Sequence, residues 1–122
     1  FHGTPRAHME DLLGTTPDAE VDAMLGPRRA TVMAGGHTHL QMVRQFRGTL
    51  VVNPGSVGAA FKAYANRGPP TLMPYAEYAT VDAERGGVQV TLRRVPLNTR
   101  ALRAVAAASA NPMGPLMVQQ YA

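Results

Sequence analysis

The sequence predicts an α/β chain, and three observations lead to this fold class. Short apolar runs bounded by Gly and Pro, typical of strands, occur along the 122 residues. Two other segments carry apolar residues at helical spacing. Loops with unusual polar residues follow three of the predicted strands. The length allows one domain over residues 1–122, with a core that needs no disulfide bonds.

The first predicted helix begins at Thr16-Pro17-Asp18. A hydroxyl at the cap, a proline in the first turn and an acid near the positive end of the helix dipole all favour a helix start. One apolar face follows, and Gly26-Pro27 ends the helix; that face consists of Val21, Met24 and Leu25.

Strands are predicted immediately after this helix. Residues 30–34 form a short apolar run that leads into Gly35-Gly36, which indicates a buried strand entering a loop. Residues 42–46 and 49–53 flank Arg47-Gly48, the pattern of a β-hairpin with a two-residue turn.

In the second half of the chain, the sequence predicts a long loop, here called the excursion, followed by another pair of strands. Residues 61–74 contain three prolines and one glycine, so we expect a surface loop there. Residues 76–81 and 88–95 are the next strands, joined by a turn rich in Gly.

The C-terminal part is predicted to be helical. Asn98 is placed to cap a helix over residues 99–108, whose apolar stripe would be formed by Leu102 and Val105. A segment rich in Pro and Gly then ends the helix, and we expect the tail over residues 111–122 to hold at most a short helix.

The charge is basic and unevenly distributed. Twelve Lys and Arg residues oppose eight Asp and Glu residues, for a net charge of +4, and residues 23–76 contain no acid. An anionic ligand would be favoured by such a field, although a solvated basic face explains the pattern equally well. The basic residues of this stretch are Arg28, Arg29, Arg44, Arg47, Lys62 and Arg67.

Composition excludes two classes of protein. There is no cysteine, so disulfide scaffolds and thiolate metal sites are excluded, and the composition fits a reducing compartment; we expect a cytoplasmic location. The longest uncharged run, residues 104–122, contains Asn, Pro and Gln, so we expect no membrane association.

Three of the four histidines lie at expected strand ends. His2 precedes a glycine, and His37 and His39 lie in a GGHTH motif directly after a predicted strand. Functional residues of open α/β sheets gather at the carboxyl ends of strands, and neutral imidazole is a good ligand for Zn, Mn, Fe or Ni. The sequence therefore predicts a metal site at His2, His37 and His39, while a set of hydrogen-bonded loop histidines is the alternative. His8 lacks this context and is expected on the surface.

The order HGTP, GGHTH and VVNPGS resembles the C-terminal half of the calcineurin-like metallophosphoesterases, most closely their small prokaryotic phosphodiesterase branch. The resemblance covers residue 1 to about residue 95. It implies the C-terminal half of a four-layer α/β/β/α sandwich, a mixed β-sheet with flanking helices, and a dinuclear metal site. By this resemblance His2 and His37 would bind one ion and His39 the other. The NPGS segment would line the site, although a tight turn without substrate contact is the simpler reading.

The sequence departs from the family in its acidic motifs. The family's D-x-H, G-D and G-N-H-[DE] motifs are absent. Two divalent ions ~3.5–4 Å apart repel by a gross term on the order of 20 kcal/mol at an effective dielectric of about 20, which bridging carboxylates offset and neutral imidazoles do not. We therefore expect this chain to be part of a longer enzyme, with the N-terminal half of the same domain as its partner, and to be inactive alone.

The resemblance implies a metal-dependent phosphoesterase, more specifically a phosphodiesterase, in which two divalent ions (Mn, Ni, Fe or Zn) activate hydroxide. The substrate would be a phosphoester such as a nucleotide, and Arg6 would contact a phosphate oxygen, although a plain surface arginine is as good a reading. A non-catalytic binding module on the same scaffold and a basic nucleic-acid-binding domain are the alternatives. We also expect self-association through apolar surface that the missing half would cover.

Overall fold

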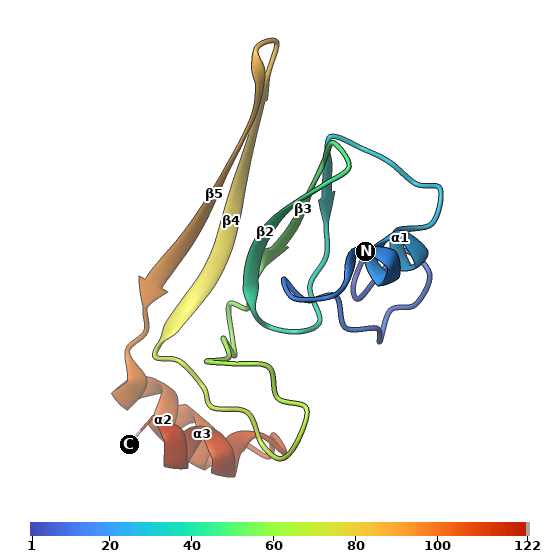
Figure 1. Cartoon of the computed structure of the whole chain (residues 1–122). Helices are drawn as coiled ribbons and strands as arrows, with labels where there is room; N and C mark the ends of the chain where they lie inside the picture. Colours follow the sequence, from blue (N-terminus) through green and yellow to red (C-terminus); the bar gives the residue numbers. More distant parts are fainter. Residues whose placement is uncertain (122) are drawn as a thin grey trace.

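The computed structural model describes residues 1–121 and confirms the α/β fold class, a mixed sheet with flanking helices (Figure 1). Its elements, in chain order, are α1 (Asp18–Leu25), β1 (Val32–Ala34), β2 (Gln41–Phe46), β3 (Thr49–Pro54), β4 (Tyr75–Glu84), β5 (Gly87–Pro96), α2 (Thr99–Ala108) and α3 (Gly114–Gln120).

The central sheet has the strand order β1-β3-β2. β1 runs parallel to β3, with Met33 opposite Val51, whereas β2 is antiparallel to β3 and forms with it the predicted hairpin around Arg47-Gly48. β3 is the middle strand, and its Val51 and Val52, which point to opposite faces of the sheet, are 1% and 2% exposed, so both faces are covered at this strand.

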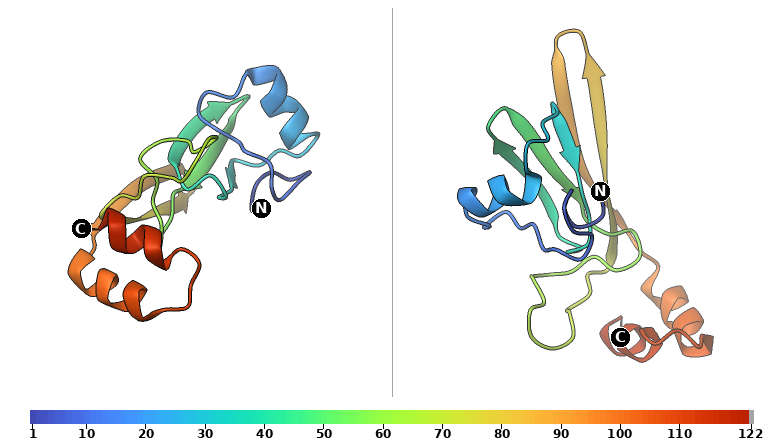
Figure 2. Two further views of the ribbon diagram at one scale, coloured as in Figure 1. Left: turned by 90° about the horizontal axis from the view of Figure 1, so that it is seen from below. Right: turned by 90° about the vertical axis from the view of Figure 1, so that its right-hand side faces the viewer.

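Helix α1 covers one face of this sheet (Figures 1 and 2). Val21 and Leu25, four residues apart, are completely buried, and they belong to a core cluster that also contains Leu12, Met24, Met33, Phe46 and Val51. The predicted Thr16 cap is wrong. Its hydroxyl accepts from the backbone N–H of Leu13 (2.9 Å) in the preceding turn, and no side chain caps α1.

β4 and β5 form a second, two-stranded hairpin on the other side of the central sheet, and its tip projects beyond that sheet (Figures 1 and 2). The Gln41 side-chain amide lies within hydrogen-bonding distance of the carbonyl oxygens of Tyr78 (3.2 Å) and Arg93 (2.9 Å). The backbone N–H of Glu77 donates to the carbonyl of Ser56 (2.9 Å). These contacts fix the foot of the hairpin against the end of β3.

α2 and α3 pack against each other at the C-terminal end of the chain (Figure 1). Asn98 caps α2 as predicted, its Oδ1 accepting from the N–H of Ala101 (3.0 Å). The predicted apolar stripe is wrong at Val105, which is 67% exposed. Ala106 is buried instead, because Gly114 of α3 lies so close that a Cβ there would be 2.8 Å from the Ala106 carbonyl oxygen.

The tail is attached to the excursion over residues 61–74. Gln120 of α3 accepts from the N–H of Leu72 and donates to the carbonyl of Pro70 (2.7 Å). The excursion itself carries one isolated bridge, between Phe61 and Leu72. Over the described residues, none of the helices combines the length and apolar character needed to cross a bilayer.

Candidate functional site

The N-terminal segment lies beside the end of β1. The N-terminal ammonium group of Phe1 donates to the carbonyl of Ala34 (3.2 Å), and the N–H of Gly36 donates to the carbonyl of His2 (2.6 Å). A Cβ at Gly35 would lie 2.3 Å from the Phe1 ring, so a larger residue there would displace this 43% exposed side chain. The GG pair thus brings His2 alongside the GGHTH loop.

His2 and His37 meet although 35 residues separate them. The His2 Nε2 and His37 Nδ1 atoms are 3.1 Å apart, and the two rings are edge-on with centroids 5.0 Å apart. When two nitrogens bind the same ion at about 2.0–2.1 Å each, they stand roughly 3.0 Å apart at an octahedral angle and roughly 3.4 Å apart at a tetrahedral angle. The separation fits two ligands of a single divalent ion, and it equally fits a hydrogen bond between the two rings.

Asp11 lies on the other side of the His37 ring. Its Oδ1 is 3.4 Å from His37 Nε2, and its Oδ2 accepts from the hydroxyl of Tyr64 (2.6 Å). This hydrogen bond raises the pKa of Tyr64 above its ordinary value. Asp11 precedes α1, and the irregular chain before the helix carries it to the site.

His39 faces a different part of the chain. Its Nδ1 is 2.7 Å from the carbonyl oxygen of Ala59, and its ring packs on Phe61 with centroids 4.5 Å apart. Because a carbonyl oxygen only accepts, Nδ1 carries the proton and Nε2 keeps a free lone pair. His39 is therefore in the tautomer that ligates through Nε2.

The three imidazoles do not meet in one group, and this corrects our expectation of a shared pocket. Among residues 1–121 no group of three or more His, Asp or Glu side chains is placed to hold an ion. The reason is Thr38, which is buried between the two motif histidines, so that His37 turns toward the N-terminal segment and His39 toward residues 59–61. The metal-ligand roles of the three histidines stay predictions.

Asn53 of the NPGS segment braces the GGHTH loop. Its side-chain amide donates to the carbonyl of Gly36 (2.8 Å) and to the hydroxyl of Thr38 (3.0 Å), while its Oδ1 accepts from the N–H of Gly55 (2.9 Å). The loop needs this support because His37 and His39 both have positive φ, 65° and 57°. Such strained backbone gathers at functional sites.

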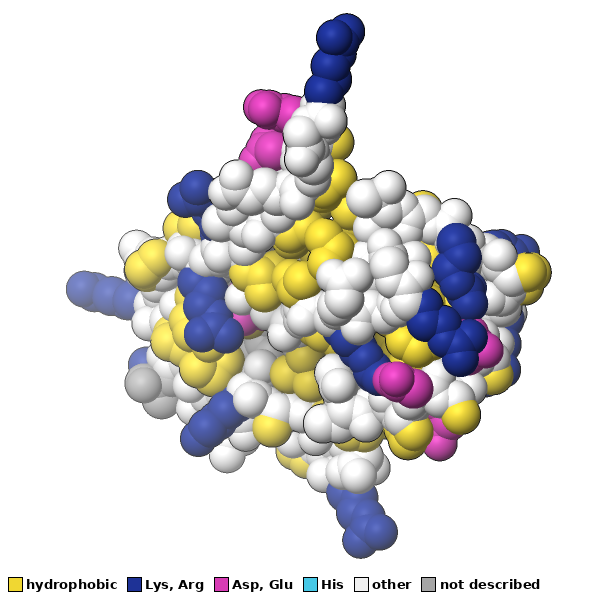
Figure 3. All heavy atoms as spheres, turned by 45° about the horizontal axis from the view of Figure 1, so that its top comes forward, with side chains coloured by type: hydrophobic (Ala, Val, Ile, Leu, Met, Phe, Trp, Pro, Cys, Tyr) yellow, Lys and Arg dark blue, Asp and Glu magenta, His cyan; other side chains and the backbone are white. Residues whose placement is uncertain are grey.

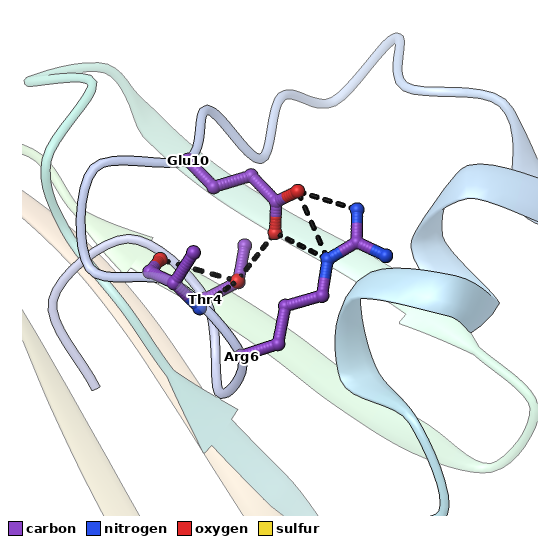
Figure 4. A network of polar contacts seen from close by, with 4 residues as sticks. Thr4, Arg6 and Glu10 are labelled. Carbon is purple, nitrogen blue, oxygen red and sulfur yellow. Dashed lines mark hydrogen bonds and ion pairs between the residues drawn. The ribbon is translucent and has the colours of Figure 1, made fainter.

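Arg6, the predicted phosphate contact, is engaged within its own loop (Figure 4). Its Nε lies 3.0 Å from both carboxylate oxygens of Glu10, and the Thr4 hydroxyl donates to the same carboxylate (2.6 Å). These hydrogen bonds, that from Arg6 first, hold the pKa of Glu10 below its ordinary value. The structure therefore gives Arg6 a structural partner, and its role in substrate binding stays a prediction.

Sequence reasoning found the three histidines but missed Asp11, Tyr64 and the bracing role of Asn53. Asp11 and Tyr64 lie in segments without periodicity, and their contact joins residues 53 apart in the sequence. The one available signal for Asn53 was its position at the end of a strand, directly before a Pro-Gly turn.

Comparison with known proteins adds a family match. The profile of the calcineurin-like phosphoesterase superfamily domain matches residues 1–86. No curated protein sequence matches the chain. Among solved structures, Vacuolar Protein Sorting 29 from Cryptosporidium parvum is similar over 79% of this chain and 50% of its own, with 22% sequence identity and a TM-score of 0.34. The chain thus spans about half the length of that structure.

Proposed function

The chain belongs to the calcineurin-like phosphoesterase superfamily, and from this premise we propose that it forms the histidine-bearing side of a divalent-metal site that hydrolyses phosphodiesters. The observation that carries the proposal is the 3.1 Å approach of His2 Nε2 to His37 Nδ1. Loop segments from two distant parts of the sequence converge there, and the family match includes both.

The chain's own residues prepare the imidazoles for this task. The Asp11 carboxylate, which only accepts, favours the proton of His37 on Nε2 and leaves the Nδ1 lone pair facing His2. We assign His2 and His37 to one ion and His39, through Nε2, to another. Divalent ions (Mn, Ni, Fe or Zn), two in the complete enzyme, would supply Lewis acidity toward the phosphoryl group when bound.

The basic character of the chain supports an anionic substrate less strongly than the sequence alone implied. Arg44 pairs with Asp18, and Arg29 and Arg47 both pair with Asp22 (2.8 Å each). Two acids of α1 thus form ion pairs with three arginines of the acid-free stretch and offset part of their charge. The phosphodiester and nucleotide preferences therefore depend on the family resemblance.

Calorimetric titration with Mn²⁺ and Zn²⁺ tests the proposed ligands. We expect the 122-residue chain to bind one ion weakly, and His37→Ala to abolish the binding because one of the two adjacent nitrogens is lost. His8→Ala is the matched control, since His8 is exposed and outside the pair. With either ion present, we expect the isolated chain to leave bis(4-nitrophenyl) phosphate intact.

Two results would contradict this assignment. Tight binding of two ions with turnover would show that the isolated chain needs no further acidic ligands. Failure to bind either ion, with the His2 and His37 rings still in contact by NMR, would favour the alternative of a non-catalytic binding module.

A further inference from the structure

An apolar cavity lies next to the histidine pair. Its volume is about 350 Å³, within the range of small-molecule sites. It is open to solvent and lies between the segment before α1, the start of β2 and the excursion, and its wall includes Leu12, Leu13, Leu40, Met42, Lys62 and Tyr64.

This cavity adjoins the site already described. A second cavity, of about 260 Å³, contains Asp11 and His37, and Thr38 and Tyr64 line both cavities. The two cavities are therefore neighbours, separated by Thr38 and Tyr64.

The residues that line the larger cavity indicate what kind of chemical group it binds. No Asp or Glu lines the larger cavity, and Lys62 is its one cationic side chain. The polar groups at the boundary already have partners, because the Thr38 hydroxyl accepts from Asn53 (3.0 Å) and the Tyr64 hydroxyl donates to Asp11 (2.6 Å). The rest of the wall is mainly the apolar side chains of leucines, Met42 and Ala63, with Thr15 and Gln41 as further polar residues, and such a wall suits an aromatic ring.

We propose that this cavity binds the aromatic part of the phosphoester, an aryl group or a base, while its phosphate lies beside His37. Lys62 would attract the anion at the entrance. The inference rests on the proposed function for the position of the phosphate. It adds that the substrate carries an aromatic group, recognised by apolar contact with little selection among rings, because the wall is mainly apolar.

Methyl NMR of the chain labelled at the methionine methyl groups tests this in metal-free buffer. We expect phenyl phosphate and thymidine 5′-phosphate to shift the Met42 methyl resonance, since this side chain lines the cavity. Methyl phosphate and inorganic phosphate should leave it in place. Met113 lies in the loop before α3 and serves as the internal control.

A variant that removes the charge of Lys62 provides the second test of the aromatic site. Lys62→Met should weaken phenyl phosphate binding about two- to fivefold, the range expected of an exposed charge pair, and leave phenol binding unchanged. Arg67→Met is the matched control, because Arg67 lies on the same excursion but does not line this cavity.

The readout separates this inference from the proposed function, because it requires neither metal nor turnover. A Met42 response to phenyl phosphate in a protein that binds no ion would support the aromatic site and contradict the metal site. Equal responses to phenyl and methyl phosphate, or equal shifts of Met42 and Met113, would overturn the aromatic site whatever the outcome of the metal titration.

Discussion

The tautomer of His39 is fixed by a single carbonyl oxygen, that of Ala59, 2.7 Å from Nδ1. We expect a long-range ¹H–¹⁵N spectrum at pH 8 to show His39 with its proton on Nδ1, since the carbonyl cannot donate. Ser56→Ala should shift this population toward a mixture, because the Ser56 hydroxyl accepts from the N–H of Ala59 (3.1 Å) and holds that peptide. A His39 proton on Nε2 in the unmodified chain would show that the Ala59 contact does not form.

The hydrogen bonds to Glu10 lead us to expect that the stability of the fold depends on pH. Hydrogen bonds from Arg6 and then Thr4 hold the pKa of Glu10 below its ordinary value. A carboxyl group with a lowered pKa in the folded state stabilises the fold above the ordinary Glu pKa of about 4.3, and this contribution is lost as the pH falls through the lower, folded-state pKa.

Urea unfolding between pH 7 and pH 2.5 measures this contribution. Glu10→Gln should lower stability at pH 7 and flatten the acid limb of the curve. Arg6→Gln should do the same, because it removes the first cause of the pKa shift. An acid limb that stays steep in both variants would place the responsible carboxyl groups elsewhere.

At the level of residues, the sequence predicts the meeting of His2 with His37 and little else about the site. His37 follows a predicted strand and the family resemblance puts His2 on the same ion, although no strand precedes His2 in the described residues. The contacts of Asp11 and Tyr64 depend instead on the course of irregular loops. The separation of His39 from the pair depends on the burial of Thr38, which no periodicity indicates in so short a motif.

Two glycines with the same backbone conformation differ in their surroundings. Gly55, in the turn after β3, and Gly48, in the turn between β2 and β3, have φ of 82° and 81°. A Cβ at Gly55 would lie 2.1 Å from Glu77 Oε2 and 2.8 Å from Gln41 Cγ, whereas nothing lies within 4 Å of a Cβ at Gly48.

Alanine substitution at Gly48 and at Gly55 distinguishes the cost of left-handed backbone from the cost of steric overlap with neighbouring side chains. Gly48→Ala should cost about 1–2 kcal/mol, the penalty of left-handed backbone alone. Gly55→Ala should cost about 1–3 kcal/mol more, because the foot of the β4–β5 hairpin must move away. Equal losses in the free energy of unfolding, measured with urea, would mean that β4 does not press on this turn.

At the level of elements, the two hairpins and the first and second helices follow from the sequence because each has a local cause. Alternating or apolar runs around Arg47-Gly48 and around Arg85-Gly86 pair without help from distant segments. The errors arise where tertiary contacts decide. Val105 is exposed because α3 packs on Ala106 instead, and the Thr16 hydroxyl turns back to Leu13.

The whole molecule is uneven in shape, because the β4–β5 hairpin extends beyond the central sheet (Figures 1 and 2). Figure 3 shows hydrophobic side chains gathered below the hairpin's tip, with Lys and Arg side chains spread around them. One face of the hairpin is apolar, since cross-strand pairing places Ala79, Val81, Val90 and Leu92 together, while the opposite face carries Thr80 and Thr91. Among the described residues β4 and β5 form a sheet only with each other, so beyond the foot, where the Glu77 N–H donates to the Ser56 carbonyl, no further strand covers their outer edges.

Such a surface predicts self-association of the isolated chain. Val81 is 45% exposed, and burying it with its neighbours against a second copy removes apolar area from water while the open edges gain hydrogen bonds. We expect sedimentation velocity to show dimers or larger species whose fraction grows with concentration.

Val81→Lys should return the chain to a monomer, because a charged side chain would be buried without a partner. Thr80→Lys, one residue away on the opposite face, should leave the association intact. A concentration-independent monomer of the unmodified chain, or equal effects of the two lysines, would mean that this face is not the contact.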